Sequence, residues 1–104
     1  MSDTVTTEKL NIDEKTEMNV DEPSMYKVIF LNDDHTPMEF VIGLLIELFR
    51  YNEETAKELT MKIHEEGSAV VGTYTYEIAE QKGIEATRLS RNNGFPLTIK
   101  IDKE

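Results

Sequence analysis

The chain contains 104 residues, 38% of them hydrophobic, with 11 Lys and Arg residues against 21 Asp and Glu residues. This length allows one small domain, and the net charge of −10 argues against nucleic acid and anionic lipid as ligands, because an acidic surface repels both. The chain has no cysteine, which excludes disulfides, thiolate catalysis and cysteine-ligated metals. The first residues do not resemble a secretion signal, and the apolar run 40–46 is far shorter than the roughly 20 residues of a membrane helix. We therefore expect a cytoplasmic protein that binds neither membranes nor nucleic acid.

Residues 1–24 differ in composition from the rest of the chain. They hold seven acidic residues and two lysines, with scattered apolar residues and no aromatic residue. Such a composition is typical of a solvated tail. This segment carries half of the net charge, and the remaining 80 residues have an ordinary globular composition. We therefore expect a flexible acidic N-terminal extension over 1–24 and a folded core domain over 25–104.

The folded part begins with a strand and a turn. Residues 25–31, MYKVIFL, are rich in β-branched and aromatic side chains, which favours a strand with at least one covered face. Residues 32–37, NDDHTP, have the composition of a turn, in which Asn and Asp bond their own backbone.

A capping-box sequence predicts where the first helix begins. Thr36 is placed to cap the helix, Pro37 to take the first helical position, and Glu39 follows three residues after the cap. We expect this helix to run to about Tyr51. Its polar residues form one narrow stripe, so the helix must be covered on two sides or must line a pocket.

A second helix and a second strand follow. Asn52 is expected to cap the helix and Gly67 to end it, with a core face made of Ala56, Leu59 and Ile63. Residues 68–74 predict a strand with Gly72 at a bulge or bend.

The third helix and the last strand complete the domain. The helix is expected over about 75–92, and the strand over 97–101. The helix positions expected to face inward are Ile78, Ile84 or Ala86, and Leu89. The predicted fold class is α+β, a single small domain in the order β-α-α-β-α-β, with three helices packed on a small antiparallel three-stranded sheet.

The polar residues allow more than one function when they are considered alone. Asp33, Asp34, His35 and His64 offer enough oxygen and imidazole donors for a divalent metal in a small metal-dependent enzyme. A ribosome-associated docking domain of similar architecture is a second alternative. However, no HExxH motif, Gly-rich phosphate loop or nucleophile elbow is present, and the same residues are common in ordinary turns and helix ends.

Three segments together resemble the ClpS family of Clp protease adaptors. They are MYKVIFLNDDHTPMEFV, KIHEEGSAVVGTYTYEIAEQK and PLTIKIDKE, and the resemblance spans about residues 23–104. It implies an adaptor without enzymatic activity or cofactor, which binds substrates that begin with Leu, Phe, Tyr or Trp. It also implies delivery of these N-degron substrates to an ATP-dependent Clp AAA+ unfoldase and its peptidase.

The resemblance assigns roles to individual residues. The substrate α-amino group is expected at Asn32, Asp33 and His64, with Asp34 supporting the turn. A primary ammonium carries three donors and a charge, so its site needs convergent acceptors that include a carboxylate. The hydrophobic pocket is expected to be lined by Thr36, Met38, Val41, Thr60, Ile63 and Leu97.

One pocket position departs from the family pattern. Thr60 lies where relatives selective for bulky residues commonly have a methionine that excludes β-branched side chains. We therefore expect weaker exclusion of N-terminal Ile and Val, unless Met61 restores the same wall.

The resemblance also implies contacts with the unfoldase. Glu77 and Lys82 on the third helix match the residues that contact the unfoldase N-terminal domain. The extension matches the family's mobile tail in place and character, and its 24 residues could reach about 80 Å when extended.

Overall fold

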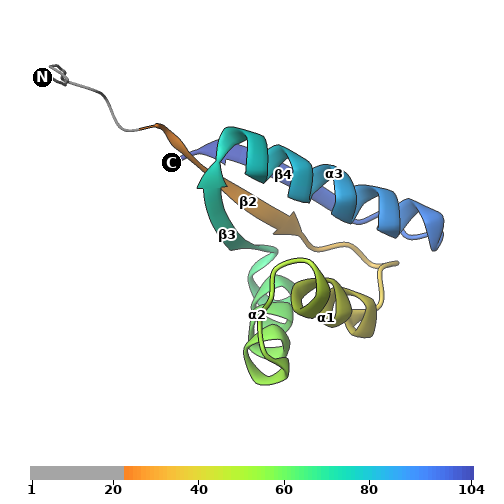
Figure 1. The fold of residues 1–104 in the computed structure, drawn as a ribbon. Coiled ribbons are helices and arrows are strands. Elements are labelled where there is room, and N and C mark those ends of the chain that lie inside the picture. Colours follow the sequence, from red (N-terminus) through yellow and green to blue (C-terminus); the bar gives the residue numbers. More distant parts are fainter. Residues whose placement is uncertain (1–22) are drawn as a thin grey trace, which may run out of the picture.

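The computed structural model describes residues 23–104, so the extension expected over 1–24 lies almost wholly outside the described part. The elements follow the predicted order (Figure 1): β2 Met25–Leu31, α1 Met38–Glu47, α2 Glu53–Glu66, β3 Ser68–Thr75, α3 Tyr76–Asn92 and β4 Thr98–Lys103. The predicted α+β class, with three helices and a three-stranded antiparallel sheet, is confirmed.

The sheet has β2 at its centre, in the order β3-β2-β4. Both neighbours of β2 run antiparallel to it. The register between β2 and β3 shifts between Val28, which is opposite Gly72, and Ile29, which is opposite Val70. The bulge predicted at Gly72 is therefore present, and a Cβ atom at this position would lie 2.4 Å from the Tyr74 hydroxyl oxygen. The tight contact explains why glycine occupies the bulge.

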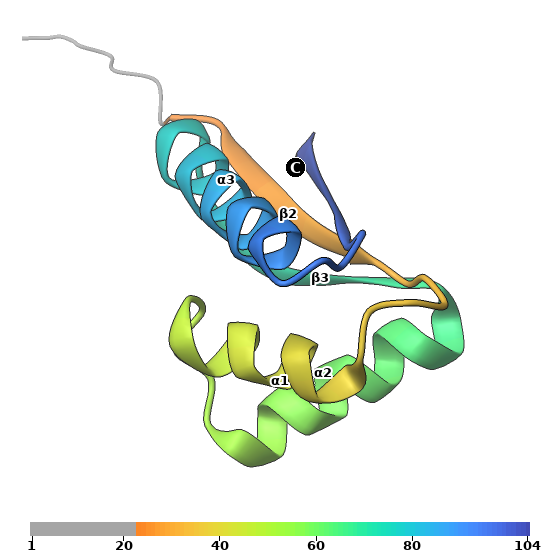
Figure 2. The ribbon, with the colours of Figure 1, turned by 90° about the vertical axis from the view of Figure 1, so that its right-hand side faces the viewer.

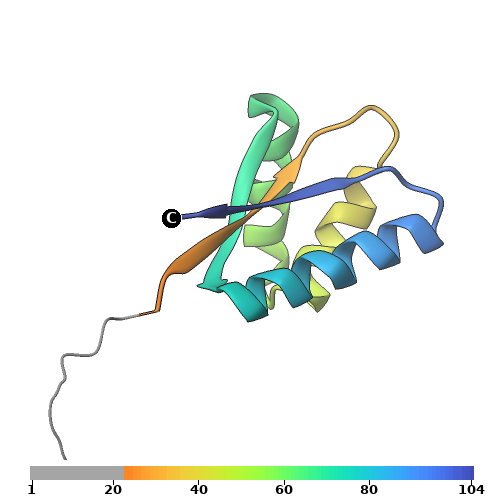
Figure 3. The same cartoon turned by 90° about the horizontal axis from the view of Figure 1, so that it is seen from above.

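The helices lie on one side of the sheet (Figures 2 and 3). Alternate residues of β2 show this arrangement, because Val28 and Phe30 are completely buried whereas Ile29 is only partly covered. Phe49, which follows α1, packs edge-on against the ring of Phe30 at 5.5 Å between centroids. One continuous core thus joins the central strand to the helices. No helix within residues 23–104 is long and apolar enough to cross a membrane.

The first helix begins and ends differently from the prediction. Pro37, with an extended backbone, is the N-cap, and no side chain caps the helix. Thr36 does not serve as the predicted cap, and its side chain is turned toward Asp33, to whose carboxylate the hydroxyl donates at 2.8 Å. The helix ends at Glu47 rather than near Tyr51, since Arg50 adopts a left-handed backbone with φ of 64° and interrupts the helical geometry.

The second helix agrees closely with its local signals. The Asn52 side chain accepts a hydrogen bond from the Thr55 N–H at 2.8 Å, as expected of a helix cap. Gly67 ends the helix with a left-handed φ of 92°, a conformation that favours glycine. Ala56 and Ile63 are buried in the core, as predicted, and Leu59 packs against the core from the side.

The third helix agrees only in part with the prediction. Ile78 is 48% exposed, so the inward placement expected for it is wrong. Of the two alternatives Ile84 and Ala86, Ala86 is buried and Ile84 is 59% exposed, and Leu89 packs against the core as expected. The buried positions are occupied by small residues, namely Ala79, Gly83, Ala86 and Ser90. A Cβ atom at Gly83 would lie 3.2 Å from the Ile101 side chain. Small residues therefore allow α3 to approach the sheet more closely than an isoleucine face would permit.

Candidate functional site

The end of β2 lies between two segments that are distant in the sequence. Leu31 is opposite Ser68 of β3 on one side and Thr98 of β4 on the other. The next residue, Asn32, donates its backbone N–H to the Gly67 carbonyl oxygen at 2.9 Å. The start of the polar turn is thus fixed beside the end of α2 and the beginning of β4.

His64 belongs to the last turn of α2 and is exposed. It precedes Gly67 by three residues, which is one turn of an α-helix. Because Gly67 is bonded to Asn32, the structure brings the end of α2 that carries His64 to the polar turn. Asn32 and His64, two of the three residues expected to contact an amino group, thus come from adjoining segments.

The carboxylate of Asp33 organises the turn that leads into α1. One of its oxygens accepts the N–H groups of His35 and Thr36, both at 2.7 Å, and the other accepts the Thr36 hydroxyl at 2.8 Å. Burial raises the pKa of Asp33, but these hydrogen bonds and the positive charge of His35 together lower the pKa more strongly, so that it lies below its ordinary value. Asp33 therefore places a stable negative charge beside Asn32.

The neighbouring Asp34 has the more accessible position. It is exposed, whereas Asp33 is half-buried, and none of the turn's side-chain hydrogen bonds within residues 23–104 involves the Asp34 carboxylate. The supporting role expected for Asp34 is performed in the structure by Asp33. The turn thus presents one carboxylate that is largely occupied and one that faces solvent.

The metal alternative finds no support in the geometry. Among residues 23–104, no group of three or more His, Cys, Asp or Glu side chains is arranged to hold a metal ion. The four candidate donors of the turn and α2 therefore do not converge as a metal site requires.

Half of the residues expected to line the hydrophobic pocket belong to the core. Val41, Ile63 and Leu97 are between 1% and 6% exposed and lie in the same cluster. At the beginning of α1, Met38 is 37% exposed. The structure therefore leaves Met38 as a partly exposed apolar side chain at the beginning of α1, with a flexible thioether that can adapt to different shapes.

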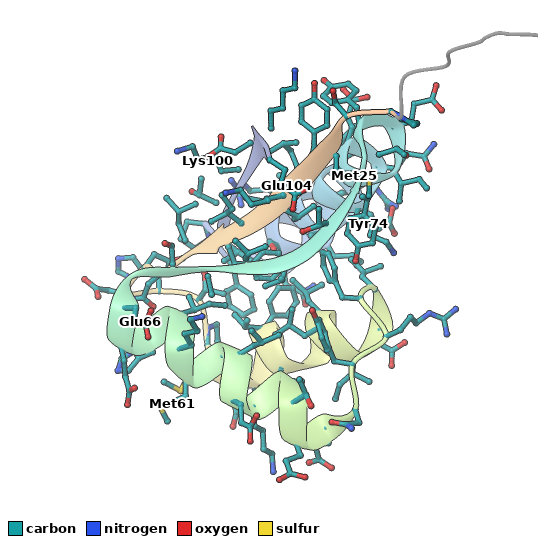
Figure 4. The ribbon with its side chains drawn as sticks, turned by 90° about the vertical axis from the view of Figure 1, so that its left-hand side faces the viewer. Met25, Met61, Glu66, Tyr74, Lys100 and Glu104 are labelled. Carbon is teal, nitrogen blue, oxygen red and sulfur yellow. The ribbon has the colours of Figure 1, made fainter. Side chains whose placement is uncertain are left out.

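Thr60 and Met61 point in different directions from α2. Thr60 is only 4% exposed, and its hydroxyl donates to the Ala56 carbonyl oxygen at 2.8 Å within the helix. Met61 is 45% exposed and lies on the outer side of α2 (Figure 4). α2 therefore directs the short, hydrogen-bonded Thr60 side chain inward and the Met61 side chain toward solvent.

The two residues expected to contact an unfoldase have different environments. Glu77 is exposed at the beginning of α3. Lys82 is half-buried, and its Nζ donates to the Leu48 carbonyl oxygen at 2.7 Å. The same ammonium lies 5.5 Å and 5.4 Å from the ring centroids of Phe49 and Tyr74, at distances typical of cation–π contacts. Lys82 thus links α3 to the end of α1, a structural role that the sequence analysis did not identify.

Comparison with known proteins shows which family the chain is similar to. The model of the family described as "ATP-dependent Clp protease adaptor protein ClpS" matches residues 21–100. A ClpS adapter from Sodalis glossinidius is 49% identical over 81 residues, covering 78% of this chain and 76% of the relative. A ClpS adapter from Treponema denticola is 46% identical over 82 residues, covering 79% of this chain and 81% of the relative.

A solved structure agrees with the sequence relatives. Agrobacterium tumefaciens ClpS2 bound to L-phenylalaninamide matches with a TM-score of 0.78 and 46% identity, over 80% of this chain and all of the solved chain. The sequence motifs, the fold and both kinds of relative agree. The chain belongs to the ClpS family of Clp protease adaptors.

Proposed function

We propose that this protein binds the free α-amino group and bulky apolar first residue of N-degron substrates, and delivers them to a Clp AAA+ unfoldase in the cytoplasm. The observation that carries the proposal is the placement of the polar turn between the end of α2 and the beginning of β4. Asn32 is fixed there by Gly67, beside the ionised Asp33 and beside the last turn of α2, which bears His64.

The donors of a substrate amine determine what the site must offer. An α-ammonium brings three N–H donors and one positive charge. Asn32 offers a carbonyl oxygen, and neutral His64 offers a ring nitrogen. Asp34 offers an exposed carboxylate, while Asp33 supplies charge and uses most of its acceptor capacity within the turn. We therefore assign direct contact to Asn32, His64 and one remaining lone pair of Asp33 or the Asp34 carboxylate.

The ligand of the solved relative supports this division of the site. L-phenylalaninamide, bound to Agrobacterium tumefaciens ClpS2, combines a free amine with a benzyl side chain and lacks the rest of a peptide. In the present chain the apolar group would enter between Met38 and the buried residues Val41, Ile63 and Leu97. Thr36 and Thr60 complete the lining of this pocket. Burial of a whole aromatic or leucine side chain contributes about 1.5–3 kcal/mol, which makes the first residue the main source of affinity.

Delivery uses a separate surface. Glu77 and Lys82 are proposed to contact the N-terminal domain of the unfoldase. The acidic residues 1–24 are proposed to engage the unfoldase while the core holds the substrate. The chemistry of ATP hydrolysis and peptide cleavage then belongs to the partners, and the adaptor itself requires no cofactor.

The first test compares a peptide that begins with Leu with its N-acetylated form. Acetylation removes the charge and two of the three donors, which leaves the acceptors of the site unpaired. We expect binding of acetyl-Leu peptide to fall by at least about 100-fold in a fluorescence anisotropy titration. A serine-initiated peptide with a free amine is the matched control for the apolar pocket. Equal binding of the acetylated and free Leu peptides would contradict the proposal.

A second prediction concerns pH. Because the pKa of Asp33 is lowered, this carboxylate stays ionised between about pH 7 and pH 5, and imidazoles gain a proton in this range. Protonated His64 would lose its acceptor nitrogen and place a second cation beside the ammonium. We therefore expect affinity for a Leu peptide to fall several-fold on acidification. His64→Gln should bind more weakly than the wild type at neutral pH but with little pH dependence. An equally steep pH dependence in that variant would contradict the assignment.

A third prediction tests the role of Thr60. Enlarging this buried side chain by Thr60→Met or Thr60→Leu should exclude β-branched residues and raise the preference for N-terminal Leu over Ile by about 10-fold. Met61→Thr is the control, because Met61 is exposed, and it should leave this preference unchanged. Competition between Leu and Ile peptides measures the ratio, and circular dichroism verifies the fold. Unchanged discrimination in both folded Thr60 variants would refute the role.

A fourth prediction separates docking from stability on α3. Glu77→Lys changes an exposed side chain and should weaken binding to the unfoldase N-terminal domain without changing urea unfolding. Lys82→Met removes the hydrogen bond to Leu48 and the aromatic contacts, so it should also destabilise the domain by about 1–2 kcal/mol. Wild-type unfoldase affinity in Glu77→Lys would exclude Glu77 from the interface.

A further inference from the structure

A groove of about 440 Å³ lies between α3 and β4, outside the site already described. The helix and the strand run side by side (Figures 1 and 3). The groove is lined mainly by apolar groups, with Glu80 and Arg88 on the helix. Its remaining lining residues are Gly83, Ile84, Thr87, Ile99 and Ile101.

The groove leaves apolar surface and a strand edge uncovered within residues 23–104. Ile84 is 59% exposed, and Gly83 beside it packs closely against the side chains of Ile99 and Ile101, which also line the groove. β4 is an edge strand, bonded to β2 on one side only. Exposed strand edges next to apolar surface readily accept another extended segment.

Charge is unevenly distributed between the two halves of the described domain. Residues 32–67, which include α1 and α2, hold nine acidic and three basic residues. The remaining described segments, 23–31 and 68–104, hold five acidic and six basic residues. The groove lies in this second set of segments. Its acidic and basic residues nearly balance, so it does not repel an acidic segment as the first set does.

The N-terminal segment joins the described domain beside the end of β4, which is one of the two elements that form the groove. Met25 accepts a hydrogen bond from the Glu104 N–H at 2.8 Å, so β2 begins beside the end of β4 (Figure 4). The 22 residues that precede Pro23 carry a net charge of −5. At about 3.3 Å per extended residue, they can span the whole length of β4 several times.

These residues also contain a short motif that occurs twice. Leu-Asn-Ile-Asp-Glu occupies 10–14, and Met-Asn-Val-Asp-Glu occupies 18–22. In each copy two apolar residues are separated by one asparagine, so both would point to the same side of an extended segment. Two acidic residues follow directly in each copy.

We propose that the chain's own N-terminal segment, residues 10–22, docks in extended form in the groove between α3 and β4. The apolar pair of one copy, Leu10 and Ile12 or Met18 and Val20, covers Ile84, Ile99 and Ile101. The acidic pair that follows meets Arg88 at the rim.

The rim can supply the required positive charge. Arg88 lines the groove together with Glu80, and it forms an exposed ion pair with Glu85. Exposed pairs of this kind contribute little, so Arg88 can exchange partners at small cost. The two copies of the motif compete for one groove.

A tethered segment has an effective concentration in the millimolar range. A segment whose dissociation constant for the groove is also about millimolar would therefore be docked about half of the time.

The inference goes beyond the proposed adaptor function and does not depend on it. If the function also holds, a docked segment would be withheld from the unfoldase until the groove releases it. Docking itself is tested on the isolated full-length protein without substrate or unfoldase.

The experiment uses paramagnetic relaxation enhancement in NMR. Because the chain has no cysteine, Thr16→Cys provides one spin-label site between the two copies. We expect the amide signals of Thr87 and Ile99 to be attenuated at least about twofold more strongly than those of Glu58 and Met61 on α2. Equal attenuation at both places, or none, would overturn the proposal.

Two variants and one mixing experiment complete the test. Ile84→Asp changes an exposed residue of the groove, and serine at positions 10, 12, 18 and 20 removes the apolar pairs. Each should reduce the selective attenuation at least about twofold, and persistence in both would contradict docking. Mixing spin-labelled chains with ¹⁵N-labelled chains that carry no spin label should give no attenuation. Attenuation in the mixture would assign the groove to a second copy instead.

Discussion

The hydrogen bond from the Asn32 N–H to the Gly67 carbonyl oxygen joins the parts on which the site depends. It fixes the first residue after the central strand to the glycine that ends α2. The same strand end is bordered by β4 on its other side. Residues from the turn, α2 and the start of β4 thus lie close together. If the bond were lost, the polar turn and His64 could separate.

A second constraint is the carboxylate of Asp33, which accepts three hydrogen bonds within the turn. Its lowered pKa means that the turn keeps its shape and its charge over the neutral range. The same bonds hold the His35 and Thr36 backbone in place directly before Pro37, the N-cap of α1. The neighbouring Asp34 is exposed.

Local signals predicted much of this architecture from the sequence. The strand 25–31, the Asn52 cap and the Gly67 end of α2 each depend on neighbouring residues alone. Thr36 was assigned wrongly because two short-range partners compete for its hydroxyl, and a sequence pattern does not rank them. Ile78 was placed inward because large apolar residues usually face the core, but here small residues allow closer packing.

Two features of the site depend on long-range contacts, which the sequence does not reveal. Lys82 was interpreted as a docking charge, and its bond to Leu48 joins residues that lie far apart in the sequence. The exposure of Met61 beside the buried Thr60 likewise depends on how α2 is rotated. The site residues themselves were named through family resemblance, and the structure explains how their segments come together.

A crystal structure of the protein with a Leu-initiated peptide would show whether the turn and the end of α2 jointly hold a substrate amine. We expect the peptide nitrogen within about 2.7–3.2 Å of the Asn32 side-chain oxygen and a His64 ring nitrogen, with the Leu side chain behind Met38. A peptide amine bound elsewhere, with Asn32 and His64 facing only solvent, would contradict this assignment.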